Sequence, residues 1–144
     1  MIEKKMKNIK EKELKIAEQI AREVHKGQKR PIGNEDYITH PEAVANSFEN
    51  IEYKIVAWLH DVLEDSDLEF KDLIEKGISY YLVESVDYLT REKDQNYKDY
   101  ILQIKEDEIA TKVKIEDLRH NLLDLKNGSM RDKYLLALYI LKEK

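Results

Sequence analysis

Residues 58–65 read Trp58-Leu59-His60-Asp61-Val62-Leu63-Glu64-Asp65 and continue an apolar run that begins near residue 53. The spacing of the apolar residues predicts a buried helix over residues 53–64. On such a helix His60 and Glu64 are four residues apart, as are Asp61 and Asp65, so the two polar pairs share one side. An imidazole and a carboxylate there can share a divalent metal, and the second pair can handle its water. The simpler alternative is a helix that merely ends in exposed acidic residues.

The length and composition of the chain predict one all-helical domain. It has 144 residues and a mass of 17.1 kDa, with only 4 Gly and 2 Pro among many strong helix formers. We therefore expect a single helical domain over residues 1–144. Ser66 to Glu69 has the form of a capping box, which predicts a further helix ending at Gly77. Apolar periodicity predicts the other helices at residues 9–26, 42–48, 53–64, 80–89, 97–104, 109–113 and 130–141.

Charge and cysteine content exclude several classes of function. The chain has no cysteine, which excludes disulfides, thiol nucleophiles and thiolate zinc sites. A finely mixed 38% of charged residues and a net charge of -5 predict no general attraction to nucleic acid. No apolar run is long enough to span a membrane, and residues 1–12 do not resemble a signal peptide. We expect a cytoplasmic protein, and the sequence does not indicate its oligomeric state.

Two further polar positions can join the His60-Asp61 pair. His40 precedes Pro41, a favourable first residue of a helix, so its backbone position is restricted. Asp117 shares a helical face with His120 and Asn121. The set His40, His60, Asp61 and Asp117 offers two imidazoles and two carboxylates. Such a donor set suits six-coordinate manganese or iron, and zinc remains an alternative.

The chain resembles the HD-superfamily hydrolase domain of RelA/SpoT-type alarmone enzymes over about residues 14–124. The resemblance rests on several motifs in the same order and at similar spacing. These motifs are HKGQKR (25–30), YITHP (37–41), HDVLED (60–65), LT (89–90) and VKIEDLRHN (113–121). It implies an all-helical HD domain with one manganese ion that removes the 3′-pyrophosphate from guanosine tetra- or pentaphosphate.

The resemblance also assigns roles residue by residue. It implies that the metal ligands are His40, His60, Asp61 and Asp117. It implies that Glu64 and Asp65 orient and deprotonate the attacking water. It places Arg30, Lys114 and Asn121 at or near the nucleotide.

Three positions depart from the family pattern. The usual Asp-Arg-Leu-His-Asn run is Asp117-Leu118-Arg119-His120-Asn121 here, so the arginine is shifted by about 100° around the helix. Asp124 replaces a hydroxyl residue, and Pro31 replaces a second basic residue. These changes favour one alternative, an HD phosphohydrolase that acts on a different nucleotide. A second alternative is a nucleotide-binding module without catalysis.

Overall fold

The computed structural model describes residues 1–143 and contains eight α-helices within that range. Their bounds are α1 Ile2–Val24, α2 Thr39–Asn46, α3 Ile51–Leu59, α4 Phe70–Glu75, α5 Tyr80–Tyr88, α6 Tyr97–Lys105, α7 Glu108–Leu122 and α8 Ser129–Lys142. Across residues 1–143 no strand forms, and an isolated bridge joins Lys29 to Asp36. The all-α prediction is therefore confirmed. Within the same residues, no helix combines the length and apolar character needed to cross a membrane.

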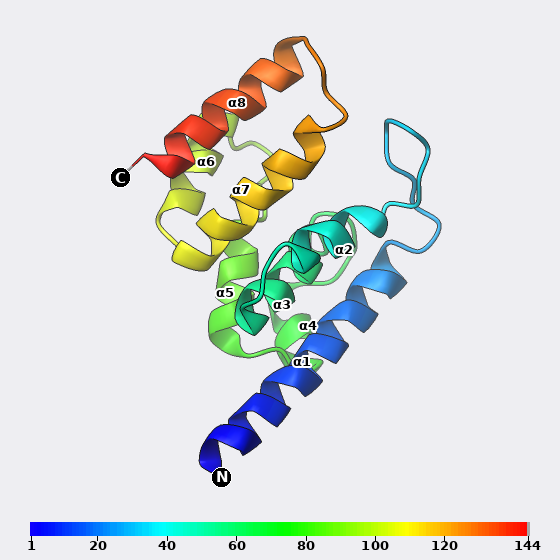
Figure 1. Cartoon of the computed structure of the whole chain (residues 1–144), viewed down its shortest axis with the longest axis vertical. Helices are drawn as coiled ribbons and strands as arrows, with labels where there is room; N and C mark the ends of the chain where they lie inside the picture. The colour runs from blue at the N-terminus through cyan, green and yellow to red at the C-terminus, as the bar shows by residue number, and fades with distance from the viewer. Residues whose placement is uncertain (144) are drawn as a thin grey trace.

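The helices are arranged around α3 and α7. Helix α3 packs against α1, α2, α5 and α7, and α7 also packs against α2, α6 and α8. Figure 1 shows α1 to α5 in the lower part of the molecule and α6 to α8 in the upper part. Because α2 and α3 both contact α7, residues from three distant parts of the sequence meet where these helices join.

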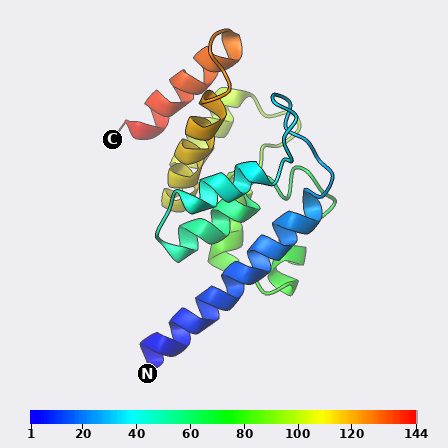
Figure 2. The same cartoon turned by 45° about the vertical axis from the view of Figure 1, so that its right-hand side comes forward.

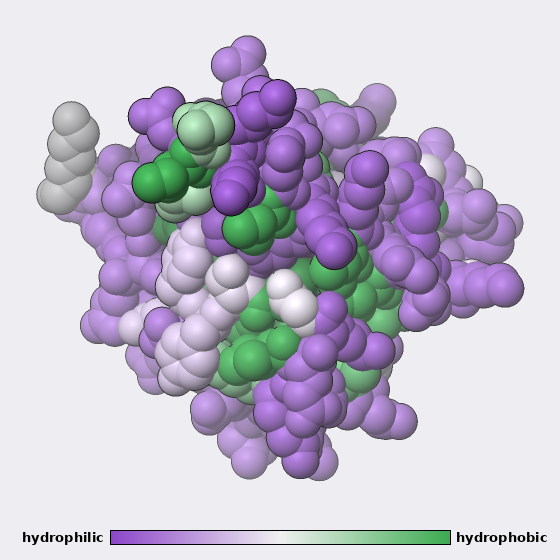
Figure 3. All heavy atoms as spheres, turned by 90° about the horizontal axis from the view of Figure 1, so that it is seen from below, coloured by the Kyte–Doolittle hydropathy of each residue, from purple (hydrophilic) through white to green (hydrophobic). Residues whose placement is uncertain are grey.

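Helix α1 is longer than its apolar pattern predicts. It begins at Ile2, whereas the periodicity predicts a start at residue 9. Ala17, Ile20 and Ala21 are buried, but Ile9 is 62% exposed. The first turns extend beyond the other helices in both ribbon views (Figures 1 and 2). Viewed from below, the surface is mainly hydrophilic and is interrupted by hydrophobic areas (Figure 3).

A buried acid fixes α1 against the start of α5. Glu13 is 3% exposed, and its carboxylate accepts hydrogen bonds from Ser79 N at 2.6 Å and Ser79 Oγ at 3.1 Å. Lys10 Nζ lies 3.0 Å from the same carboxylate. Since Ser79 precedes the first residue of α5, Glu13 satisfies a backbone N–H that the helix itself leaves unpaired.

The expected helix end at residue 64 and the expected helix start at Ser66 are wrong. Helix α3 ends at Leu59, so residues 60–65 form turns after the helix. His60 Nδ1 donates to Ala57 O at 2.6 Å and thereby occupies a carbonyl near the end of α3. The expected capping box at Ser66 does not form either. Ser66 Oγ donates to Val62 O, and the Asp72 carboxylate instead accepts from Glu69 N at the start of α4.

Candidate metal centre and adjoining pocket

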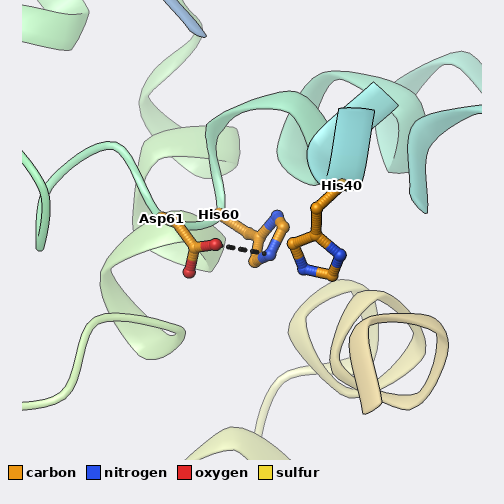
Figure 4. A group of neighbouring side chains, drawn as sticks. All are labelled: His40, His60 and Asp61. Carbon is orange, nitrogen blue, oxygen red and sulfur yellow. Dashed lines mark ion pairs between the residues drawn. The ribbon is translucent and has the colours of Figure 1, made fainter. Parts of the chain in front are cut away.

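His40, His60, Asp61 and Asp117 lie together although α2, the turn after α3, and α7 supply them. His40, His60 and Asp61 each offer a ligand atom within 4.8 Å of the others. Figure 4 shows these three side chains converging, with His60 Nε2 3.0 Å from Asp61 Oδ2. Asp117 Oδ1 lies 2.7 Å from His40 Nε2 and 3.4 Å from His60 Nε2. The structure therefore brings together all four residues expected to bind a metal.

The imidazole of His60 is oriented as a metal ligand requires. Its Nδ1–H donates to Ala57 O, so Nε2 is the nitrogen that can bind an ion through a lone pair. With no ion bound, Asp61 and Asp117 outweigh burial and raise the pKa of His60. His60 Nε2 is buried and has no hydrogen-bond partner, although two carboxylate oxygens lie within 3.4 Å. A buried nitrogen without a partner is costly unless something else binds it. A cation between these donors would complete the coordination of the nitrogen and neutralise the carboxylates.

The carboxylates of the cluster favour the ionised state. Burial opposes ionisation of Asp61, but the neighbouring His60 outweighs it and lowers the pKa of Asp61 to about 2. Burial likewise opposes ionisation of Asp117, and Lys114 and His60 hold its pKa well below the usual range. Lys114 Nζ lies 2.8 Å from Asp117 Oδ2. Two ionised carboxylates in one buried cluster make it suitable for a divalent cation.

Glu64 and Asp65 follow the cluster along the turn and bond to other segments. Glu64 Oε1 accepts from Arg91 N at 2.6 Å. Burial raises the pKa of Glu64, and that hydrogen bond opposes the rise. Asp65 Oδ2 accepts from Gln28 Nε2 at 3.2 Å. The two acids are thus anchored, and Glu64 is a better proton acceptor than an ordinary exposed glutamate.

A cavity of about 300 Å³ adjoins the cluster. It is lined by Arg30, Pro31, Ile32, Tyr37, Asn121, Asp124, Leu125, Met130 and Tyr134. Asn121 connects the cavity to the cluster, because its Nδ2 donates to Asp117 Oδ1 at 3.1 Å. The mixture of apolar walls and a few polar groups is typical of a small-molecule site.

Two positions that depart from the family pattern have defined places in the structure. Arg30 Nη2 lies 3.2 Å from Asp124 Oδ2 and also donates to Asn121 Oδ1 at 3.0 Å. The acid at residue 124 therefore partly neutralises the cation of the cavity. Leu118 is fully buried, and Arg119 is exposed and paired with Glu116. The shifted arginine consequently does not reach the cavity.

Two contacts of the cluster were not assigned a role from sequence. Tyr37 OH donates to Asp61 Oδ2, and His120 Nδ1 lies 2.7 Å from His40 Nδ1. Burial and the nearby His40 and Arg30 lower the pKa of His120, which keeps its imidazole neutral. Sequence spacing places His120 on the same face as Asp117, but it does not identify His40 as the partner. Tyr37 is three residues before His40, and that spacing is the one available signal.

No protein-family model matches the sequence. The bifunctional (p)ppGpp synthase/hydrolase SpoT of Escherichia coli K12 is 35% identical over 135 residues, which covers 83% of this chain and 19% of that protein. The chain is homologous to part of SpoT. Guanosine-3′,5′-bis(diphosphate) 3′-pyrophosphohydrolases of Haemophilus influenzae and Aquifex aeolicus are each 34% identical over 78% of this chain and 18% of the relative. The chain thus spans about a fifth of these curated relatives.

The fold of this SpoT-homologous chain also occurs in a solved structure. A metazoan orthologue of SpoT, which hydrolyses ppGpp, aligns with a TM-score of 0.69 and 22% sequence identity. The alignment covers 90% of this chain and 83% of the orthologue. The helical HD-domain fold expected from the sequence motifs is therefore confirmed.

Proposed function

We propose that the chain is a metal-dependent phosphohydrolase that removes the 3′-pyrophosphate from (p)ppGpp. One observation carries the proposal: His40, His60, Asp61 and Asp117 form a buried cluster beside a cavity of about 300 Å³. Homology to part of SpoT supports the choice of substrate. The cluster and the cavity share Asn121 as a link, so a nucleotide in the cavity can place a phosphate at the metal.

The four clustered residues are the proposed metal ligands, and Mn²⁺ is the proposed ion. Two imidazoles and two carboxylates suit six-coordinate Mn²⁺ or iron, and zinc is the third candidate. The buried His60 Nε2 supports this ligand set, because it faces carboxylate oxygens of Asp61 and Asp117 at 3.0 and 3.4 Å. A bound divalent ion would polarise a phosphoryl oxygen and lower the pKa of water.

Glu64 and Asp65 are the proposed groups that handle the attacking water. A general base works best when its pKa lies closer to the working pH, and burial raises the pKa of Glu64 in that direction. The N–H of Arg91 binds one oxygen of Glu64 and leaves the other free to accept a proton. Gln28 Nε2 donates to Asp65, which is the group proposed to orient the same water.

Arg30, Asn121 and Lys114 are the proposed contacts to the nucleotide. Arg30 lines the cavity, where its planar guanidinium can contact a phosphate or a base. Asn121 lies between Arg30 and Asp117. Burial lowers the pKa of Lys114, but Asp117 outweighs it and raises that pKa well above the usual value. Lys114 therefore remains cationic and can stabilise a phosphate at the metal.

A second candidate function keeps this chemistry and changes the nucleotide. The observation that favours it is the 3.2 Å contact between Asp124 and Arg30, which reduces the positive charge available to a substrate phosphate. A nucleotide that carries fewer phosphates near Arg30 suits such a pocket better than one with a phosphate there.

A substrate panel distinguishes these functions. Purified protein loaded with Mn²⁺ is incubated with ppGpp, pppGpp, GTP, GDP and a phosphorylated dinucleotide, and phosphate products are separated by anion exchange. The Asp61→Ala variant is the matched control, because it lacks one proposed ligand. We expect turnover of ppGpp and pppGpp that this variant loses. Turnover of another nucleotide alone would support the second candidate, and binding without turnover would indicate a non-catalytic module.

A further inference from the structure

Three side chains connect the cavity to the metal-ligand cluster. Arg30 Nη1 lies 3.3 Å from His120 Nδ1, and the same His120 nitrogen lies 2.7 Å from His40 Nδ1. The rings of His120 and His40 are nearly coplanar and meet edge to edge, with centroids 5.0 Å apart and an interplanar angle of 25°. His40 is a proposed metal ligand, and Arg30 lines the cavity.

The donor and the acceptor in each contact of this Arg30–His120–His40 series follow from the chemistry of Arg30. A guanidinium has N–H donors and no acceptor, so the nitrogen it contacts on His120 must accept. His120 Nδ1 therefore carries a lone pair, and its ring proton is on Nε2. His40 Nδ1 faces that lone pair at 2.7 Å, and two lone pairs cannot form a hydrogen bond. His40 Nδ1 must accordingly be the donor.

The proton on Nδ1 leaves Nε2 as the nitrogen of His40 that can bind an ion. Nε2 faces the cluster and, with no ion bound, donates to Asp117 Oδ1 at 2.7 Å, so a cation would take the place of that proton. An imidazole binds a metal only through a nitrogen that carries a lone pair. The contacts from Arg30 to His120 and from His120 to His40 thus select the tautomer of His40 that can bind the ion.

In His60, a backbone carbonyl fixes which ring nitrogen can bind an ion. Its Nδ1–H donates to the backbone carbonyl of Ala57, and no side-chain substitution removes that acceptor. His40 instead depends on a side chain that is half-buried and replaceable. The contribution of the acceptor to metal binding can therefore be measured at His40.

We propose that His120 is a positioning residue that fixes the tautomer and ring orientation of His40, and that Arg30 fixes His120. The proposal rests on the metal centre of the proposed function. It assigns His120 no contact with substrate. It also gives Arg30 an effect on metal affinity, although Arg30 does not belong to the ligand set.

Two substitutions at residue 120 test the proposal. His120→Leu removes the acceptor, whereas the Oδ1 of His120→Asn can accept at about the position of Nδ1. The dissociation constant for Mn²⁺ is measured on the metal-stripped 144-residue chain from the electron paramagnetic resonance signal of free Mn²⁺. We expect about 10- to 100-fold weaker binding in His120→Leu, as is typical when a ligand loses its supporting hydrogen bond. We expect His120→Asn to stay within about threefold of wild type.

A double-mutant cycle with Arg30→Met tests whether Arg30 fixes the tautomer of His120. In the wild-type background we expect Arg30→Met to weaken Mn²⁺ binding about three- to tenfold, because His120 then populates both tautomers. In the His120→Leu background no acceptor remains for Arg30 to orient, so the same substitution should have no effect. A loss of general stability would act equally in both backgrounds, so the cycle separates the two explanations.

The results that overturn the proposal are distinct. Wild-type Mn²⁺ affinity in His120→Leu would exclude a positioning role, and equal losses in His120→Leu and His120→Asn would exclude the acceptor as its cause. Equal effects of Arg30→Met in both backgrounds would show that Arg30 does not act on His40 through His120. Circular dichroism confirms that each variant is folded. Failure of the wild-type protein to bind Mn²⁺ would instead contradict the proposed metal centre and, with it, this inference.

Discussion

Lys114→Met should destabilise the metal-free protein by a cost that the structure defines. The Lys114 and Asp117 side chains are 14% and 6% exposed, and Lys114 Nζ lies 2.8 Å from Asp117 Oδ2. Removing one partner of a buried ion pair costs about 3–5 kcal/mol, because the other charge stays buried. Asn121 and His40 still contact the Asp117 carboxylate. We therefore expect the lower end of the range, about 3 kcal/mol.

Thermal unfolding provides the assay for this substitution. At about 2.1 cal/mol/K per residue, 144 residues unfold with an entropy of about 0.3 kcal/mol/K. A loss of 3 kcal/mol therefore lowers the Tm by about 10 °C. The Tm is followed by circular dichroism in EDTA. Lys112→Met is the matched control, since Lys112 is exposed on the same helix, and should change the Tm by less than about 2 °C.

A Tm for Lys114→Met that equals that of Lys112→Met would refute this reasoning. It would mean that the remaining contacts of Asp117 are enough to stabilise its charge. Saturating Mn²⁺ should reduce the difference between Lys114→Met and wild type, because the ion neutralises the same carboxylate. An undiminished difference in Mn²⁺ would indicate that Asp117 does not bind the ion.

Three further predictions concern the proposed base, the acid range and the α1 anchor. Glu64→Gln should retain Mn²⁺ binding and lower kcat by about 10²- to 10⁴-fold, and an unchanged kcat would exclude Glu64 as the base. His60 lowers the pKa of Asp61 to about 2 against the effect of burial, so the folded protein favours ionised Asp61. The ionised Asp61 therefore stabilises the fold above about pH 4, and this stabilisation is lost as the pH falls towards 2. A Tm titration in EDTA should show this loss, and the slope should flatten in Asp61→Asn. Glu13→Ala leaves Ser79 N without its acceptor and should cost about 2 kcal/mol in urea unfolding, whereas an unshifted urea midpoint would contradict the anchoring role.

The helical architecture could be predicted because apolar periodicity and helix-forming composition agree along the chain. The end of α3 could not be predicted in the same way. Val62 is fully buried and Leu63 packs against the core, so the apolar pattern continues into the turn. The helix ends at Leu59, and the backbone N–H and the side chain of His60 both donate to the Ala57 carbonyl there. A periodicity argument contains no information on such a side-chain contact.

The grouping of the site residues was predictable from motifs, but their partners were not. The structure places His40 and Asp117 in contact although 77 positions separate them, as the expected ligand set requires. The Arg30–Asp124 contact spans 94 positions, and no local pattern marks these residues as partners. Glu13 shows the same limit, since an acid on an amphipathic helix is ordinarily assigned to solvent. These contacts depend on how the helices pack.

The most direct test of the central claim identifies the bond that is cleaved. Mn²⁺-loaded protein is incubated with ppGpp, and the products are followed by ³¹P nuclear magnetic resonance, with Asp61→Ala as the control. We predict one pyrophosphate for each ppGpp consumed, together with GDP that keeps its 5′-diphosphate, and no products in the control. An unchanged ppGpp spectrum, or release of orthophosphate alone, would contradict the proposed 3′-pyrophosphohydrolase activity.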